Sequence, residues 1–385
     1  MKNNIYLSFF QSKVQHPIPA YSFWEFYIKN GIEESGHEWK EGNADWAEGL
    51  LYSFDKAKLE SWKAETWEDT LRDIKLKHQQ KPISFFLSYL YPHQIDEQAI
   101  KEIQKMGIPC VNFFCDNVRE FTSAPKEFSV FDLNWVPEYK ALTMYKRAKY
   151  KHIHLPMPMW VAPQFRNVSN VESDVVSFIG SKDIQRLMLF EKVVNLGVEL
   201  KIYGAGWENS DIKIENIKNS NTFSTVLNQF DFIIRFGLES FFRKLEQRKF
   251  NTKPSDSLQR CINTKPDFDS YIKITKESAI TLGVNRYPSF LYPFDKPNTY
   301  SRLRDIEAPM LGACYLTEWT EGLEQMYELG DEIETYKDEY ELIEKITILK
   351  SDANKRKNMR LNAQKKSINE FSIENTLIKI ENAFK

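Results

Sequence analysis

The fold is decided by residues 175–207, which read VVSFIGSKDIQRLMLFEKVVNLGVELKIYGAGW. An apolar run over 175–179 ends at Gly180, a stretch with helical spacing over 184–195 closes at Gly197, and a second apolar run ends at Gly204. Strand, helix and strand in this order are typical of a parallel sheet with helical crossovers. The segment therefore predicts an α/β domain.

The same alternation precedes this segment. Apolar runs are separated by helical patterns over 21–30 and 97–106 and from Glu138 onward; the runs cover 5–10, 83–90, 111–114, 133–136 and 153–155. We expect two α/β domains in tandem, because 385 residues exceed an ordinary single domain. The predicted parts are an N-terminal domain over 1–160, a Pro-rich and polar linker over 161–174, a C-terminal domain over 175–365 with an insertion at about 230–273, and a terminal helix over 366–385 that packs across the domains.

Composition excludes several classes of protein. The chain has 52 Lys and Arg against 54 Asp and Glu, and this near balance argues against a dedicated nucleic-acid binder. Its four cysteines form no CxxC pair and have no histidine at metal-ligand spacing, so neither a disulfide framework nor a zinc site is indicated. The longest apolar run is about half of a membrane span, and we expect a cytoplasmic protein.

The loop after the first strand of the C-terminal domain is a candidate phosphate site. Gly180, Ser181 and Lys182 leave a strand and enter a helix, so their amides and the Lys182 charge can meet an anion. The chain contains neither GxGxxG nor GxxxxGK[ST]. Dinucleotide dehydrogenases and P-loop NTPases therefore become secondary alternatives.

Residues 298–317, NTYSRLRDIEAPMLGACYLT, form the second candidate site. Thr299 or Ser301 can cap a short helix, and Arg302 or Arg304 can bind a diphosphate in bidentate geometry. Glu307 lies one turn further in, where a carboxylate can accept two ribose hydroxyls. The alternative is an exposed helix on which Arg304 and Glu307 merely form an i,i+3 ion pair.

One basic and aromatic run falls in the predicted insertion. It reads FFRKLEQRKF from Phe241 to Phe250. A solvated helix is the simpler interpretation, since Lys and Arg stems often cover apolar surface. The alternative is peripheral contact with the inner face of a membrane or with an anionic acceptor.

These segments resemble CgeB-type glycosyltransferases, which are related to the group-1 transferases. Arg304, Glu307, Gly312, Leu316 and Thr317 match the family's donor-site region. Further likeness lies in 178–207, where Gly180 and Gly204 follow strands, in SAITLGVNR ending at Arg286, and in VNFFCDN, FDLNWVPE and HLPMPM of the first half.

The resemblance implies the GT-B architecture, two Rossmann-like domains with parallel sheets facing across a cleft. It implies a metal-independent, hexosyltransferase-like enzyme without cofactor, which moves a sugar from a UDP- or GDP-sugar to a glycan, lipid-linked or protein acceptor, as in polysaccharide biosynthesis. Arg304, Arg286 and Lys182 are then candidates for stabilising the departing diphosphate. Retaining group-1 enzymes carry Glu-x7-Glu, but here Thr299 stands eight residues before Glu307. The stereochemical course stays open.

The acceptor base is expected in loops that follow N-terminal strands. His16, in QHPIPAY, and Asp116, in FFCDN, are the candidates. An ordinary loop histidine and a turn-capping aspartate are the alternatives. Two further functions remain open: a non-catalytic nucleotide- or sugar-binding module, and a nucleotide-sugar epimerase of similar architecture.

Overall fold

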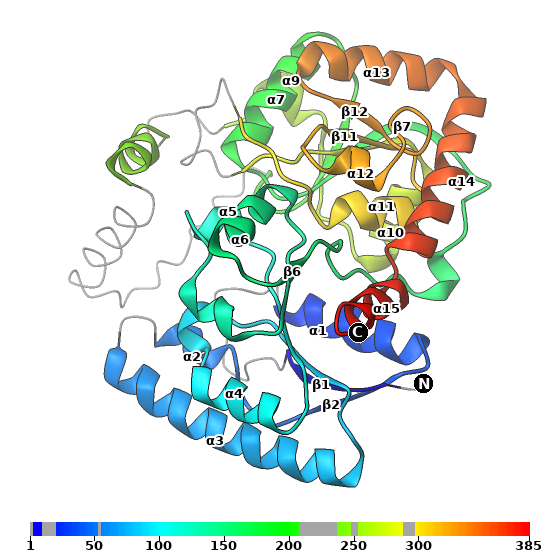
Figure 1. Ribbon diagram of the computed structural model, residues 1–385. Coiled ribbons are helices and arrows are strands. Elements are labelled where there is room, and N and C mark those ends of the chain that lie inside the picture. Colours follow the sequence, from blue (N-terminus) through cyan, green and yellow to red (C-terminus); the bar gives the residue numbers. More distant parts are fainter. Residues whose placement is uncertain (1–2, 10–20, 53–54, 208–236, 248–252, 288–296) are drawn as a thin grey trace. The chain divides into compact units, whose positions relative to one another are not determined.

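Alternating apolar strands and amphipathic helices build two six-stranded sheets. The computed structural model describes residues 3–9, 21–52, 55–207, 237–247, 253–287 and 297–385. These residues divide into unit 1, Met1–Trp160 with Asn369–Lys385, and unit 2, Val161–Ile368 (Figure 1). Each unit has its own sheet, in which every pair of neighbouring strands is parallel.

Unit 1 has the strand order β2-β1-β3-β4-β5-β6. Its strands are β1 (Asn4–Ser8), β2 (Glu38–Glu41), β3 (Phe85–Ser88), β4 (Cys110–Phe113), β5 (Leu133–Trp135) and β6 (His152–Ile153). Its helices are α1 (Tyr21–Glu34), α2 (Glu48–Leu51), α3 (Lys56–Gln80), α4 (Glu97–Lys105), α5 (Asn117–Glu120), α6 (Leu142–Ala148) and α15 (Ile373–Asn382). Short 3-10 turns cover Pro92–Gln94, Lys126–Val130 and Tyr139–Ala141.

The C-terminal helix α15 belongs to unit 1 because it packs on α1. Gly31 of α1 lies so close to Ile373 that a Cβ at position 31 would fall 2.3 Å from that side chain. The preceding helix α14 (Ala353–Glu370) ends just beyond the boundary between the two units.

Unit 2 has the strand order β12-β11-β10-β7-β8-β9. Its strands are β7 (Ser173–Ile179), β8 (Lys201–Tyr203), β9 (Ile262–Asn263), β10 (Ser278–Gly283), β11 (Tyr315–Glu318) and β12 (Glu334–Tyr336). Its other labelled elements are the 3-10 turn Pro163–Phe165 and the helices α7 (Ile184–Asn195), α9 (Asp256–Gln259), α10 (Phe268–Glu277), α11 (Arg304–Met310), α12 (Leu323–Met326) and α13 (Glu339–Ser351).

Two predictions about segments need correction. Residues 256–273, expected to lie in an insertion, contribute α9, β9 and part of α10, and β9 pairs with β8 in the sheet of unit 2. The edge strand β2 is absent from the apolar pattern because its sequence, EWKE, is charged and partly exposed.

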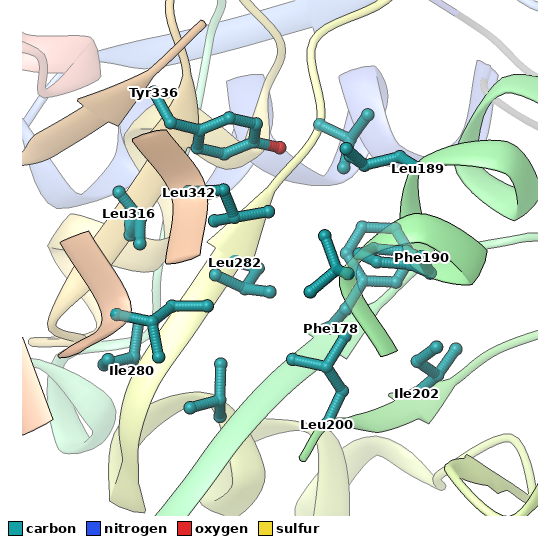
Figure 2. Packing of buried hydrophobic residues seen from close by; sticks show 14 of the residues in the cluster. Phe178, Leu189, Phe190, Leu200, Ile202, Ile280, Leu282, Leu316, Tyr336 and Leu342 are labelled. Atoms are coloured by element: carbon teal, nitrogen blue, oxygen red, sulfur yellow. The ribbon is translucent and has the colours of Figure 1, made fainter. Parts of the chain in front are cut away.

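Apolar side chains from the sheet and its covering helices form the core of unit 2. Figure 2 shows Phe178 of β7 and Phe190 of α7 on one side, with Leu282 of β10 and Leu342 of α13 beside them. All four are almost fully buried. Burial of each such side chain stabilises the fold by about 1.5–3 kcal/mol, so this cluster holds the strand ends in place.

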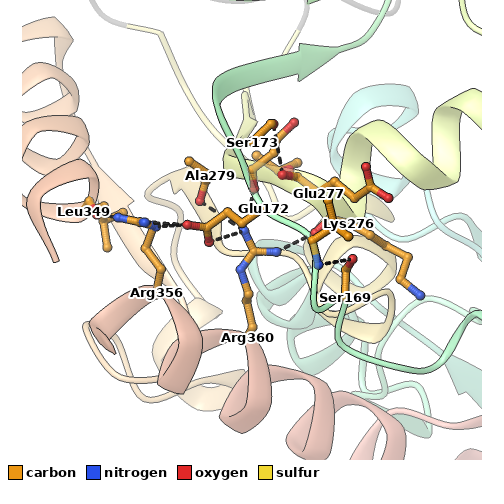
Figure 3. A network of polar contacts seen from close by, with 12 residues as sticks. Ser169, Glu172, Ser173, Lys276, Glu277, Ala279, Leu349, Arg356 and Arg360 are labelled. Atoms are coloured by element: carbon orange, nitrogen blue, oxygen red, sulfur yellow. Dashed lines mark hydrogen bonds and ion pairs between the residues drawn. The ribbon is translucent and has the colours of Figure 1, made fainter. Parts of the chain in front are cut away.

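A polar network fixes the start of β7. Glu172 accepts hydrogen bonds from Arg356 Nε and Arg360 Nη2 of α14, both at 3.0 Å (Figure 3). Arg360 also donates to the carbonyl of Ser278 at 2.6 Å. Helix α14 is thereby joined to the amino ends of β7 and β10, at the edge of the sheet opposite the candidate site.

Candidate functional site

The carboxyl edge of the unit 2 sheet contains a topological switch point. β7 lies in the middle of the sheet, between β10 and β8. After β7 the chain first adds β8 and β9 on one side of it and then returns to add β10, β11 and β12 on the other side. In open parallel sheets, ligands bind outside the carboxyl ends of strands at such a point. The loops that follow β7 and β10 carry Gly180 to Lys182 and Arg286 respectively.

The loops after β7 and β8 touch through their backbones. Gly180 N donates to Tyr203 O, Lys182 N donates to Ala205 O, both at 2.9 Å, and the indole of Trp207 donates to Gly180 O at 2.7 Å. Two of the three amides expected to bind a phosphate therefore already have carbonyl partners. The amides of Gly180 and Lys182 are already satisfied by carbonyls, so an anion here would instead meet side chains.

Three arginines gather near the switch point. Arg286 Nε donates to Glu318 Oε1 at 2.7 Å, and its Nη1 lies 3.4 Å from the carbonyl of Gln185 at the start of α7. Arg302 donates to the carbonyl of Arg286, and its guanidinium lies 4.5 Å from the ring centre of Tyr300. Burial lowers the pKa of Arg186, and the charge of Arg302 lowers it further.

Two carboxylates partly offset this positive charge: Asp183 pairs with Arg186 at 3.2 Å, and Glu318 pairs with Arg286 at 2.7 Å. Glu318 is almost fully buried at the end of β11. Burial raises its pKa, whereas the ion pair with Arg286 acts in the opposite direction. The cluster therefore has three guanidinium groups for two carboxylates, and this excess of positive charge suits a diphosphate.

The predicted capping of α11 is wrong. The helix begins at Arg304, and no side chain caps it at Leu303. Ser301 Oγ instead donates to Asp305 at 3.0 Å, and Thr299 pairs with Arg286 in an isolated antiparallel bridge. Thr299 and Ser301 therefore shape the segment leading to α11 rather than its first turn.

Asp305 is the centre of a buried hydrogen-bond network. Its carboxyl group is completely buried and accepts bonds from five groups, namely Asn285 Nδ2, Ser301 Oγ, Arg302 N, Tyr315 Oη and Thr317 Oγ1. Burial raises its pKa while these donors lower it. The network joins β10, β11 and α11, and it fixes the backbone that carries Arg302 and Arg304.

Arg304 and Glu307 form a second group with Tyr271 of α10. Arg304 Nη1 lies 2.6 Å from Tyr271 Oη and 3.6 Å from Glu307 Oε2, and Tyr271 also donates to Glu307 Oε2. Burial alone lowers the pKa of Arg304, but Tyr271 and Glu307 outweigh it and the net direction is upward. The predicted i,i+3 ion pair exists, yet both side chains are largely buried rather than exposed.

In unit 1, Asp116 lies at the carboxyl edge of the sheet, directly before α5. It is partly exposed, and its side chain does not cap α5. Cys115 Sγ lies 3.8 Å from Asp116 Oδ2. His16, the other candidate base, lies outside the described residues.

Several residues of the two polar groups around Arg286 and Arg304 were not predicted from the sequence. Tyr271 meets a residue 36 positions away, and Asn285 and Glu318 act through buried contacts. Glu138 of unit 1 could have been predicted from the sequence. It follows the predicted strand 133–136, and this strand pairs with the strand that precedes Asp116.

The residues that the structure describes contain no group of three or more His, Cys, Asp or Glu side chains placed to hold a metal ion. Among the same residues, no helix combines the length and apolar character that a bilayer span requires.

Comparison with known proteins agrees with the observed architecture. Residues 186–382, just over half of the chain, match the model of a family described as glycosyl transferase-like. A comparison with curated protein sequences gave no significant match.

Solved structures of similar fold span the whole chain. Sucrose-phosphate synthase from Thermosynechococcus elongatus is 8% identical with a TM-score of 0.57, and a glycosyltransferase from Rickettsia africae is 11% identical with a TM-score of 0.56; each comparison covers 100% of this chain and 99% of the other. Anabaena Alr3699/HepE, solved with UDP and glucose, is 11% identical with a TM-score of 0.53 over 100% of both chains. The fold is therefore GT-B, with two Rossmann-like domains.

Proposed function

We propose, from the premise that this chain belongs to the glycosyl transferase-like family, that it transfers a sugar from a UDP- or GDP-sugar to a hydroxyl group of an acceptor. The bond between the anomeric carbon and the diphosphate oxygen breaks, and its electron pair leaves with the diphosphate. The acceptor oxygen bonds to the anomeric carbon, and its proton passes to a base. The observation that carries this proposal is the arginine cluster at the switch point of unit 2.

The leaving diphosphate is assigned to Arg286 and Arg302. Their guanidinium groups come from the loop after β10 and from the segment before α11, which the Asp305 network holds in place. Prearranged positive charge lowers the barrier where negative charge develops. Gly180, Ser181 and Lys182 complete this side of the donor site, with the Lys182 side chain rather than its amide as the contact.

Glu307 is assigned to the ribose of the donor. Oε2 is the oxygen that meets Tyr271 and Arg304, which leaves Oε1 for a ligand. The buried Arg304 guanidinium lies beside this carboxyl group, and charge-assisted hydrogen bonds to hydroxyls are strong. Arg304 thus positions Glu307 and adds positive charge to the donor site.

Asp116 is assigned as the base that accepts the proton of the acceptor hydroxyl. Its partial exposure lets an acceptor reach it, and its position directly after β4 holds it more rigidly than a residue inside a long loop. The acceptor is a glycan, a lipid-linked sugar or a protein. Binding of the donor is proposed to need no metal, since arginines supply the countercharge.

A membrane-bound acceptor would suit the helix over 237–247. Leu238, Phe242 and Leu245 are exposed and, at spacings of four and three residues, share one face of this helix. Arg243 and Lys244 are their neighbours in the sequence. Retention on anionic vesicles by the parent, lost in Leu238→Ser/Phe242→Ser, would support this peripheral contact.

Product analysis over a panel of UDP- and GDP-sugars tests the proposal. Glycosyl transfer gives free nucleoside diphosphate and a glycoside. An isomerised nucleotide sugar would instead identify an epimerase, and tight donor binding with no product would identify a binding module. The anomeric configuration of the product decides between retention and inversion, which Thr299 in place of the first family glutamate leaves open.

A further inference from the structure

A second carboxyl group lies beside Asp116. Glu138 follows β5, the strand that pairs with β4, so both acids emerge from the same edge of the unit 1 sheet. Glu138 is only 2% exposed, whereas Asp116 is partly exposed.

The surroundings of Glu138 disfavour its charge. Oε2 accepts one hydrogen bond from Val118 N at 3.2 Å. Oε1 is buried and has no hydrogen-bond partner among the described residues, and no Lys, Arg or His of this part of the chain forms an ion pair with it. A buried carboxylate without a cation costs several kcal/mol, so the neutral acid is the stable form.

Every titratable group that acts on Glu138 favours this result or leaves it unchanged. Burial raises its pKa to about 8 and the charge of Asp116 contributes in the same direction, whereas hydrogen bonds from Val118 and Asn117 act in the opposite direction. Cys115 and Tyr145 also face it, and burial raises the pKa of both well above their usual values. They are neutral at neutral pH and add no charge.

We propose that Glu138 is a positioning residue of the acceptor site: a neutral carboxylic acid, enclosed beside Asp116, that holds the first turn of α5 through Val118 N and adds no second negative charge next to the base. This deepens the proposed function, because it takes Asp116 as the base. When the acceptor hydroxyl loses its proton to Asp116, Glu138 keeps its own.

Carbon-13 NMR of protein labelled at the glutamate carboxyl carbons tests the pair directly. Glu138→Gln assigns the signal, and Glu102→Gln, which removes an exposed carboxylate on α4, is the control. We expect a signal that titrates near pH 8 and is lost in Glu138→Gln alone. In Asp116→Asn it should titrate at lower pH, because a neighbouring negative charge has been removed.

Two results would overturn the inference. One is a Glu138 carboxyl that is already ionised at pH 6, and the other is a titration that Asp116→Asn leaves unmoved, as expected for a merely structural residue. This experiment needs no substrate. It therefore tests the protonation of Glu138 beside Asp116 even if no nucleotide sugar is turned over and the proposed function fails.

A kinetic measurement follows once the donor panel yields transfer to a sugar acceptor. In the parent, the pH profile of the transfer rate should show an ionisation near pH 8, where Glu138 places a second negative charge beside Asp116. Glu138→Gln should lack this ionisation because an amide does not titrate. Equal pH profiles of the transfer rate in both proteins would contradict the role.

Discussion

Gly204 lies so close to Gly180 that a Cβ at position 204 would fall 2.2 Å from the Gly180 carbonyl oxygen. Gly204 also has a φ of +137°, a conformation that residues with a Cβ rarely adopt. This contact joins the loops after β7 and β8, so glycine at position 204 is required by packing as well as by backbone conformation.

Gly204→Ala should therefore destabilise unit 2 by roughly 2–4 kcal/mol, because it combines a clash with backbone strain. Gly197→Ala is a matched control: its φ is also positive, at +91°, but nothing lies within 4 Å of the added Cβ. We expect about 1–2 kcal/mol there. Urea unfolding of both variants measures the difference, and equal losses would show that the close approach contributes nothing.

The alternation of strands and helices predicts much of this fold. For example, β7 and β8 lie in apolar runs, and α7 has apolar residues at helical spacing. The site was harder to predict. Asp305 reads as one more acidic residue of a helix, yet it accepts five hydrogen bonds from residues as distant as Asn285 and Thr317. Such networks are determined by contacts between neighbouring strands, and these contacts cannot be predicted from the spacing of residues along the sequence.

Donor binding should not depend on a divalent metal. Arg286 and Arg302 supply positive charge to the diphosphate, which is the task that a metal ion performs in other sites. Calorimetry with UDP and GDP, with and without EDTA, tests this. A loss of affinity after chelation that added Mg²⁺ restores would contradict metal-free binding.

Glu307→Ala should weaken nucleotide binding by about one to two decades, since charge-assisted hydrogen bonds contribute about 1.5–3 kcal/mol. Glu344→Ala, on the exposed side of α13, is the control. Glu307→Gln should recover part of the loss, because its amide oxygen can still accept from Tyr271. A folded Glu307→Ala protein that binds UDP as tightly as the parent would exclude the ribose role.

Arg304 and Asp116 should affect different steps. Arg304→Ala removes positive charge from the donor site and releases Glu307, so donor hydrolysis and transfer should decline together. Asp116→Asn should reduce transfer by about two to four decades with donor affinity nearly intact. Separate measurements of affinity and rate, with His16→Ala alongside, distinguish them. Parental transfer by both Asp116→Asn and His16→Ala would place the base elsewhere.

The buried acid Glu138 should also make stability depend on pH. Its pKa is raised from 4.5 to about 8 in the folded chain, so between these values the folded state binds more protons than the unfolded state. The free energy of unfolding therefore falls as pH rises through this window.

Relative to the parent, Glu138→Gln should gain stability between pH 5 and pH 8, because the amide does not ionise. Each pKa unit corresponds to about 1.4 kcal/mol, so the relative gain amounts to a few kcal/mol. Any constant cost of fitting the amide beside Val118 cancels when the two pH values are compared. Urea unfolding at both values measures the change, with Glu102→Gln as the exposed control. A difference between parent and Glu138→Gln that stays constant with pH would mean that Glu138 is ionised in the folded protein, and this would contradict its proposed role as a neutral acid beside Asp116.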